Sequence, residues 1–206
     1  MDAVQRQLND QVDDATQRLL DTARVIAEPG LRQPSLLPGW TRAHVLGHLA
    51  RSADAMRNLL IGARAGEDRL GYPSAEARAA GIAESAALEA KDLMADLAGS
   101  AMAFRAIARQ LTEEHWQYPV RILDSASFPA TQLLTRRLVE VELHHCDLGA
   151  GYSPADWPAA FAAMDLAEPM YSQRQDRLAR SHPGPPASVA PGAPPPRRAG
   201  WRPFMP

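Results

Sequence analysis

The chain has 206 residues, of which 46% are hydrophobic, and this is enough for one folded domain with its own core. Its formal net charge of -2 excludes the strongly basic surface that is typical of nucleic-acid-binding proteins. No apolar run approaches the ~20 residues of a transmembrane helix, and the polar N-terminal segment resembles neither a signal nor a transit peptide. Cys146 is the single cysteine, so no intramolecular disulfide can form. We therefore expect a cytoplasmic protein without membrane or nucleic-acid partners.

Apolar residues recur at three- and four-residue steps in four stretches, which predicts four long helices. The first helix is expected to end near Pro29 and Gly30. The second follows Thr41, a typical N-cap residue. Its expected inner stripe consists of Val45, Leu49, Ser52, Met56, Leu59 and Leu60.

The third predicted helix follows Ser74 and reaches Leu111, with an early break at Gly81. The segment 115–128 is expected to be irregular or briefly extended. Pro129 suits the first position of the fourth helix, which ends at Gly149. A short fifth helix, carrying Trp157 and Phe161, is expected after it. The pattern predicts an all-α fold, an antiparallel four-helix bundle over residues 1–170.

The composition changes near residue 171. Nine of the chain's 18 prolines lie between Pro183 and Pro206, and no acidic residue follows Asp176. Such a segment buries too little apolar surface to offset its ordering entropy. We expect residues 171–206 to be a disordered tail rich in proline, arginine and alanine.

A candidate metal site is distributed over the second and fourth helices. Glu140 and His144 lie four residues apart, so they share one face of a helix, at one edge of its apolar stripe. His48 lies at the edge of the inner stripe of the second helix. Two imidazoles and a carboxylate with one open position are typical of catalytic zinc. The alternatives are a solvated helix face for Glu140 and His144, and a hydrogen-bonded core histidine for His48.

Neighbouring residues are weaker candidates for a role in the metal site. His44 is rotated outward from His48, and His145 lies at the opposite edge of its helix and is expected to be structural. Asp147 could accept a hydrogen bond from a histidine ligand or be a surface charge. Tyr72 lines the mouth of the site or only covers a turn. Glu142 and Cys146 also lie four apart, but they are expected to project from the far side of the helix, toward solvent or another partner, and Cys146 to be a packing residue.

Three blocks of the chain resemble one family. They are LLPGWTRAHVLGHLAR at residues 36–51, YPSAEAR at residues 72–78 and RLVEVELHHCDLGAGY at residues 137–152. Together they are similar to the mycothiol-dependent maleylpyruvate isomerases, which are DinB-like four-helix metal-binding bundles, over about Leu8 to Met164. The resemblance implies an actinobacterial source, which the abundance of arginine over lysine fits.

The resemblance also implies chemistry. The family's metal ligands correspond to His48, Glu140 and His144, the metal is a divalent ion, typically zinc, and the thiol of mycothiol occupies the open position. Its thiolate would add to the conjugated double bond of maleylpyruvate and leave again after rotation, which gives cis–trans isomerisation. Arg137 and Arg42 are candidates for holding the substrate carboxylates.

Two other functions stay open. The first is a mycothiol S-transferase, which would use the same site to join mycothiol to electrophiles. The second is a non-catalytic metal-binding paralogue. Family members continue into a smaller α/β domain, whereas this sequence has the proline-rich tail, so we expect a truncation or a frameshift that puts turnover in doubt more than metal binding.

Overall fold

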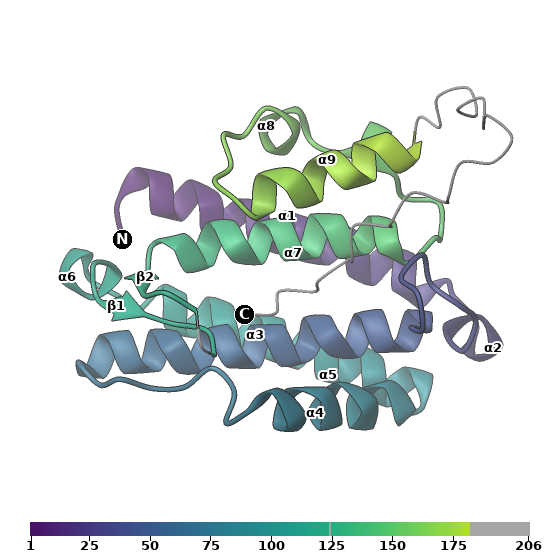
Figure 1. The fold of residues 1–206 in the computed structure, drawn as a ribbon, viewed down its shortest axis with the longest axis horizontal. Coiled ribbons are helices and arrows are strands. Elements are labelled where there is room, and N and C mark those ends of the chain that lie inside the picture. Colours follow the sequence, from purple (N-terminus) through teal and green to yellow (C-terminus); the bar gives the residue numbers. More distant parts are fainter. Residues whose placement is uncertain (124, 182–206) are drawn as a thin grey trace, which may run out of the picture.

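The structure is a computed structural model that describes residues 1–123 and 125–181 (Figure 1). Four long helices form the bundle: α1 (Ala3–Arg24), α3 (Arg42–Ala65), α5 (Ala90–Ala108) and α7 (Gln132–Asp147). Helix α1 contacts α5 and α7, and α3 contacts the same two helices, so the four close around one apolar core. The helical bundle predicted from periodicity is confirmed.

The helix directions differ from a simple alternation. Contacts join residue 18 to residue 142 and residue 22 to residue 145, so α1 and α7 run parallel. In the same way α3 and α5 run parallel, since residue 51 pairs with residue 96 and residue 64 with residue 110. Each parallel pair is antiparallel to the other. An additional helix between α3 and α5, described next, causes this order.

Helix α4 (Ala75–Ala87) returns along α3, and α5 then begins at the end of the bundle where α3 began. The Ser74 side chain caps α4 by accepting a hydrogen bond from the Ala77 amide. The expected break at Gly81 is wrong, because Gly81 lies inside α4 and the chain turns at Leu88 and Glu89, both of which are extended. The region predicted as a third helix is therefore two helices.

Short elements connect the long ones. They are α2 (Glu28–Leu31), α6 (Glu113–Trp116), β1 (Pro119–Val120), β2 (Phe128–Pro129), the 3-10 helix η1 (Pro154–Asp156) and α8 (Ala159–Ala162). The strands pair antiparallel, with Pro119 opposite Pro129. Pro129 thus lies in β2 and not at the start of α7, because the backbone there still pairs with the 116–120 segment.

Residues 170–181 form helix α9 (Met170–Ser181), which packs on α7. The prediction of disorder is wrong for residues 171–181, and the rest of the expected tail, residues 182–206, lies outside the described residues. Arg174 explains the difference, since it donates hydrogen bonds to the carbonyls of Phe161 and Met164. Polar contacts of this kind hold a segment that has little apolar surface.

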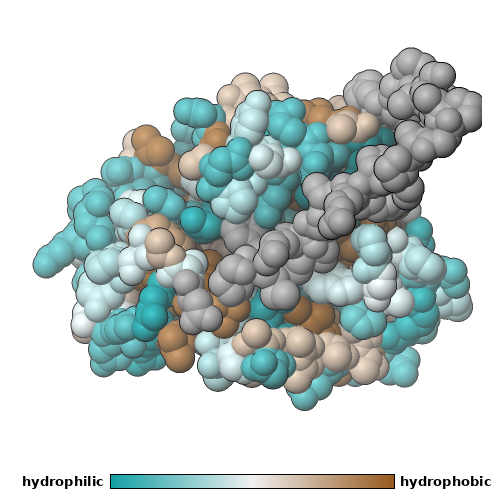
Figure 2. Space-filling view, in the orientation of Figure 1, coloured by the Kyte–Doolittle hydropathy of each residue, from teal (hydrophilic) through white to brown (hydrophobic). Residues whose placement is uncertain are grey.

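Figure 2 shows hydrophilic side chains over much of the visible face, with hydrophobic residues in small separate groups. Within the described residues, no helix combines the length and apolar character that crossing a bilayer requires.

Candidate metal centre

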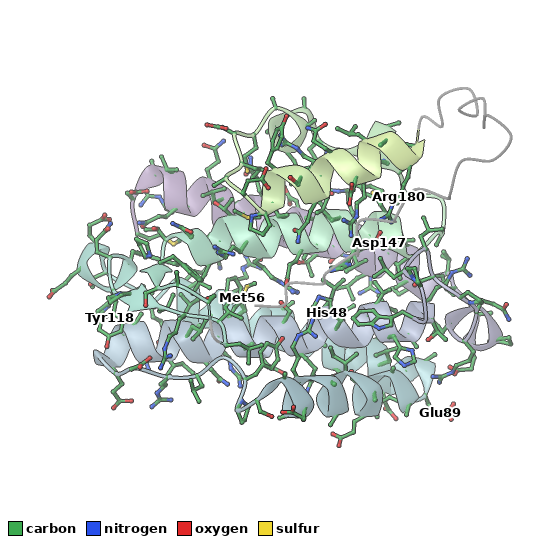
Figure 3. The ribbon with its side chains drawn as sticks, in the orientation of Figure 1. His48, Met56, Glu89, Tyr118, Asp147 and Arg180 are labelled. Carbon is green, nitrogen blue, oxygen red and sulfur yellow. The ribbon has the colours of Figure 1, made fainter. Side chains whose placement is uncertain are left out.

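His48, Glu140 and His144 meet where α3 and α7 face each other in antiparallel directions. His48 Nε2 lies 3.9 Å from Glu140 Oε1. The rings of His48 and His144 meet edge to face, with centroids 4.7 Å apart. All three side chains are buried, and His48 lies on α3 toward α7 (Figure 3). The structure thus brings the three predicted ligands to one place.

Local sequence sets which histidine of α3 reaches this place. Thr41 is the N-cap of α3, and its hydroxyl accepts a hydrogen bond from the His44 amide. His44 Nδ1 in turn accepts a hydrogen bond from the Thr41 amide at 3.4 Å, which completes a capping box, and it also lies 2.7 Å from the Thr41 hydroxyl. The His44 side chain is therefore occupied in capping the N-terminus of α3. His48, one turn later, projects into the bundle.

Asp147 supports His144, as the sequence allowed. His144 Nδ1 lies 2.9 Å from Asp147 Oδ2, so Nε2 is the ring nitrogen left for a ligand. Burial would raise the pKa of Asp147, but hydrogen bonds from His144 and Arg177 outweigh it and hold the pKa below its usual range. An ionised carboxylate can only accept, so Nδ1 of His144 carries the shared proton.

A pocket opens beside this group, and its wall includes His48, Ser52, Tyr72, Arg78 and Glu140. Arg78 is buried, and its Nη2 lies 3.4 Å from His48 Nδ1. The Arg78 guanidinium also lies over the Tyr72 ring, 5.8 Å from the centroid. Tyr72 therefore lines the site. Burial, together with the charge of Glu140, raises the pKa of its hydroxyl.

The charge around the pocket favours neutral imidazole. Burial is the largest cause that lowers the pKa of His48 well below its usual value, and His144, Arg78 and Arg137 act in the same direction. A neutral imidazole is the form that binds metals.

Arg137 and Arg42 lie at different places relative to the pocket. Arg137 is fully buried next to Glu140 and donates to the Leu49 carbonyl at 2.8 Å, and within the described residues its Nε and Nη2 have no hydrogen-bond partner. Arg42 instead donates to main-chain carbonyls, including those of Leu148 and Gly149. This places Arg42 at the junction of α3 and α7.

The types of donor atom in this group suit a zinc ion, but the side chains are not yet arranged to bind one. Donor atoms at the usual ~2.1 Å from a tetrahedral zinc are ~3.4 Å apart, close to the 3.9 Å between His48 Nε2 and Glu140 Oε1. Among the described residues, however, no three His, Cys, Asp or Glu side chains form a complete metal-binding group. Ser52 donates a hydrogen bond to Glu140 Oε2, which leaves Oε1 facing His48 Nε2. Arg78 approaches His48 Nδ1, so this contact must adjust before Nδ1 can carry the proton that leaves Nε2 free for a metal.

Comparison with known proteins identifies a family for this chain. A family model described as the mycothiol maleylpyruvate isomerase N-terminal domain matches residues 12–149, a range that contains every residue of the pocket wall. The chain belongs to this family. The comparison with curated proteins gave no match.

Two solved structures are similar to this chain. One is a mycothiol-dependent maleylpyruvate isomerase with 29% sequence identity, and the other is a histidine-to-alanine mutant of such an isomerase with 28%. Each has a TM-score of 0.73, and each match covers 76% of this chain and 65% of the solved chain. The chain therefore spans slightly less than two thirds of the length of these relatives.

On the far side of α7 the polar residues are buried and not solvated. Glu142, expected to project outward, is 1% exposed and binds Arg18 of α1 and the Tyr152 hydroxyl, each at 2.6 Å. His145 stacks on Tyr152, and burial lowers its pKa to about 4. Helix α7 is covered by α1, α3 and α9, so its polar groups bind one another.

Sequence reasoning missed three residues of the site. The first is Arg78, which is in the same family block as Tyr72, and this shared block could have indicated that Arg78 belongs to the site. Ser52 was assigned to the inner stripe only. The third is Trp40, just before the Thr41 cap, whose ring lies 5.5 Å from that of His48. None of these contacts follows from helical periodicity.

Proposed function

We propose that this chain binds one zinc ion through His48, Glu140 and His144 and, with mycothiol, catalyses cis–trans isomerisation of the maleylpyruvate type. The observation that carries the proposal is the meeting of two imidazoles and one carboxylate beside a pocket, with His144 Nδ1 already held by Asp147. The similar solved structures are mycothiol-dependent maleylpyruvate isomerases, and this similarity suggests the thiol and the substrate class.

When bound at this site, zinc would lower the pKa of the mycothiol thiol and so supply a nucleophile for reversible addition to a conjugated double bond. The chain's own residues prepare the site for this. Burial keeps His48 neutral, so its lone pair is available at neutral pH. Asp147 orients His144, and Glu140 contributes the single negative charge among the three ligands.

Arg78 and Arg137 favour an anionic substrate. Both guanidinium groups are buried near Glu140, so this carboxylate has two cations beside it. Arg78 is on the pocket wall and is the group that would bind a substrate carboxylate, because a guanidinium matches a carboxylate with two parallel hydrogen bonds. Arg137 lies behind it and adds positive potential. A dicarboxylate such as maleylpyruvate suits this arrangement.

Metal content tests the first part of the proposal. Zinc-loaded wild type should retain about one zinc per chain after dialysis, and His48→Ala, Glu140→Ala and His144→Ala should each lose it. His145→Ala and Glu142→Ala are matched controls, since both residues are buried on α7 but face α1, and they should retain zinc. Equal zinc content in all six proteins would reject the assignment.

Activity tests the second part. Zinc-loaded protein with mycothiol should convert maleylpyruvate to fumarylpyruvate, and Arg78→Met should raise KM while zinc content stays unchanged. Conjugation of mycothiol to electrophiles without any conversion of maleylpyruvate would support an S-transferase instead. Zinc binding without any effect of mycothiol would support a non-catalytic metal-binding module.

A further inference from the structure

A third helix, α9, reaches the candidate metal centre through Asp147. Arg177 of α9 places Nη2 at 2.7 Å from Asp147 Oδ2 and Nε at 3.3 Å from Asp147 Oδ1. The two side chains are 4% and 1% exposed. Figure 3 shows Asp147 on α7 toward the helix that carries Arg180, which is α9. Because the guanidinium fork contacts both oxygens, it fixes the plane of the carboxylate.

The same carboxylate orients His144. Asp147 Oδ2 receives Arg177 Nη2 and also lies 2.9 Å from His144 Nδ1. A carboxylate held at one point can rotate about its terminal torsion, which is a soft one. With Arg177 in place that rotation is removed, so the acceptor for Nδ1 stays in one direction. The direction of the His144 ring is then set by a residue that does not touch it.

Helix α9 is anchored independently of this contact. Arg174, one turn earlier, donates to the carbonyls of Phe161 and Met164 at 2.9 and 2.8 Å. Met170 is buried as well. Arg180 is a lesser neighbour, since it is 43% exposed and its Nη1 lies 3.9 Å from Asp147 Oδ1. The position of Arg177 beside Asp147 is thus fixed by a helix that other contacts, those of Arg174 and Met170, hold in place.

We propose that Arg177 is a positioning residue of the metal centre, which acts through Asp147 to aim His144 at the bound ion. The proposal rests on the proposed function, because it concerns the same zinc site. It goes beyond the family assignment, since the family match ends at residue 149 and α9 follows it. The segment expected to be a dispensable tail would then begin with part of the site.

Zinc affinity, measured by competition with a chelating dye, tests the proposal in the full chain. Arg177→Met should weaken zinc binding about 10-fold, within the ~10–100-fold loss typical when a partner of a metal-binding histidine is removed. Arg177→Lys should lie between it and wild type, because an ammonium keeps the charge but not the fork. Arg174→Met is the control for the anchoring of α9: it removes a buried arginine of α9 that does not touch Asp147, so it should lower stability but weaken zinc binding much less than Arg177→Met does.

A double-mutant cycle separates positioning from general packing. In an Asp147→Asn background, Arg177→Met should cause almost no further loss of zinc affinity, because its route to His144 is already altered. Imidazole nitrogen NMR of metal-free protein gives an independent readout. His144 should carry its proton on Nδ1 in wild type and Arg174→Met, and should show a mixture of tautomers in Arg177→Met.

Three results would overturn the proposal: wild-type affinity in Arg177→Met, an equal loss in Arg174→Met, or an undiminished loss in the Asp147→Asn background. Absence of zinc binding by wild type would instead reject the proposed function, and with it a role for Arg177 in holding zinc. An unchanged His144 tautomer in Arg177→Met would show that Arg177 does not act on His144 at all.

Discussion

Arg42, in the first turn of α3, donates hydrogen bonds to the carbonyls of Leu148 and Gly149, just past the end of α7. The last carbonyls of a helix have no hydrogen-bond partner within the helix, and a cation near them also interacts favourably with the negative end of the helix dipole. Both Nε and Nη2 lie 2.9 Å from these oxygens. The contact joins the start of α3, which carries His48, to the end of α7, which carries His144.

Replacing Arg42 should therefore reduce stability. Hydrogen bonds to charged groups contribute ~1.5–3 kcal/mol, so Arg42→Met should lower the free energy of unfolding by about 2 kcal/mol. Urea unfolding of metal-free protein measures this. Arg24→Met is the control, since Arg24 forms its ion pair with exposed Asp21 and should change stability by less than ~1 kcal/mol. Equal stability of the two variants would show that the contact at the end of α7 contributes little.

Helices α3 and α4 approach each other closely at Gly47. A Cβ atom at this position would meet the Ile82 carbonyl and the Ser85 Cβ at 3.1 Å and the Ala86 amide at 3.2 Å. Backbone atoms cannot yield without moving α4, so Gly47→Ala should destabilise the fold by ~1–3 kcal/mol despite the better helix propensity of alanine.

Gly99 of α5 is the matched control for Gly47, because a Cβ atom there would have no described residue from outside its own stretch of helix within 4 Å. Gly99→Ala should stabilise the fold by up to ~1 kcal/mol, as expected for an exposed helix interior. Thermal unfolding of both variants decides the matter, and two changes of the same sign would contradict the packing argument.

Cys146 should be chemically inert in the folded protein. It is 4% exposed, and burial raises the pKa of its thiol to about 12. Only a thiolate attacks disulfide reagents, so labelling at pH 8 should be slow in native protein and rapid in denaturant. Fast stoichiometric labelling of the native protein would show that the region around α7 opens readily.

His145 should make the metal-free protein sensitive to acid. Burial is the main cause that lowers its pKa to about 4 in the folded state, and the nearby Arg18 adds to it. An unfolded histidine has a pKa of about 6.5, so between these two values the unfolded state binds a proton that the folded state does not. The free energy of unfolding should then fall as the pH falls below about 6.5, by at most ~1.4 kcal/mol per pH unit for this residue.

Urea unfolding at pH 7.5 and pH 5 measures this dependence. His145→Gln should reduce the loss of stability between the two values, because glutamine does not titrate. His48 has a lowered pKa as well, so part of the loss should remain in the variant. An identical loss in wild type and His145→Gln would contradict a buried neutral His145.

Helical periodicity predicted which residues of one helix share a face, and the structure agrees for Glu140 and His144. It also separated His48 from His44, since the Thr41 cap and the inner stripe are patterns within one turn. Local signals failed where a pattern depended on partners elsewhere in the chain. Glu142 has a polar character that suits solvent, yet Arg18, 124 residues away in sequence, makes its burial possible.

The sequence alone therefore determined the helical class, the start of α3 and the three candidate ligands, because these depend on spacings of three or four residues and on family motifs. Only the tertiary structure decided that α4 makes α3 and α5 parallel, that Arg78 faces His48, and that Arg177 reaches Asp147. The physical reason is that a buried charge is stable only beside its partner. The Arg177–Asp147 pair spans 30 residues, and packing of α9 on α7 brings the two together.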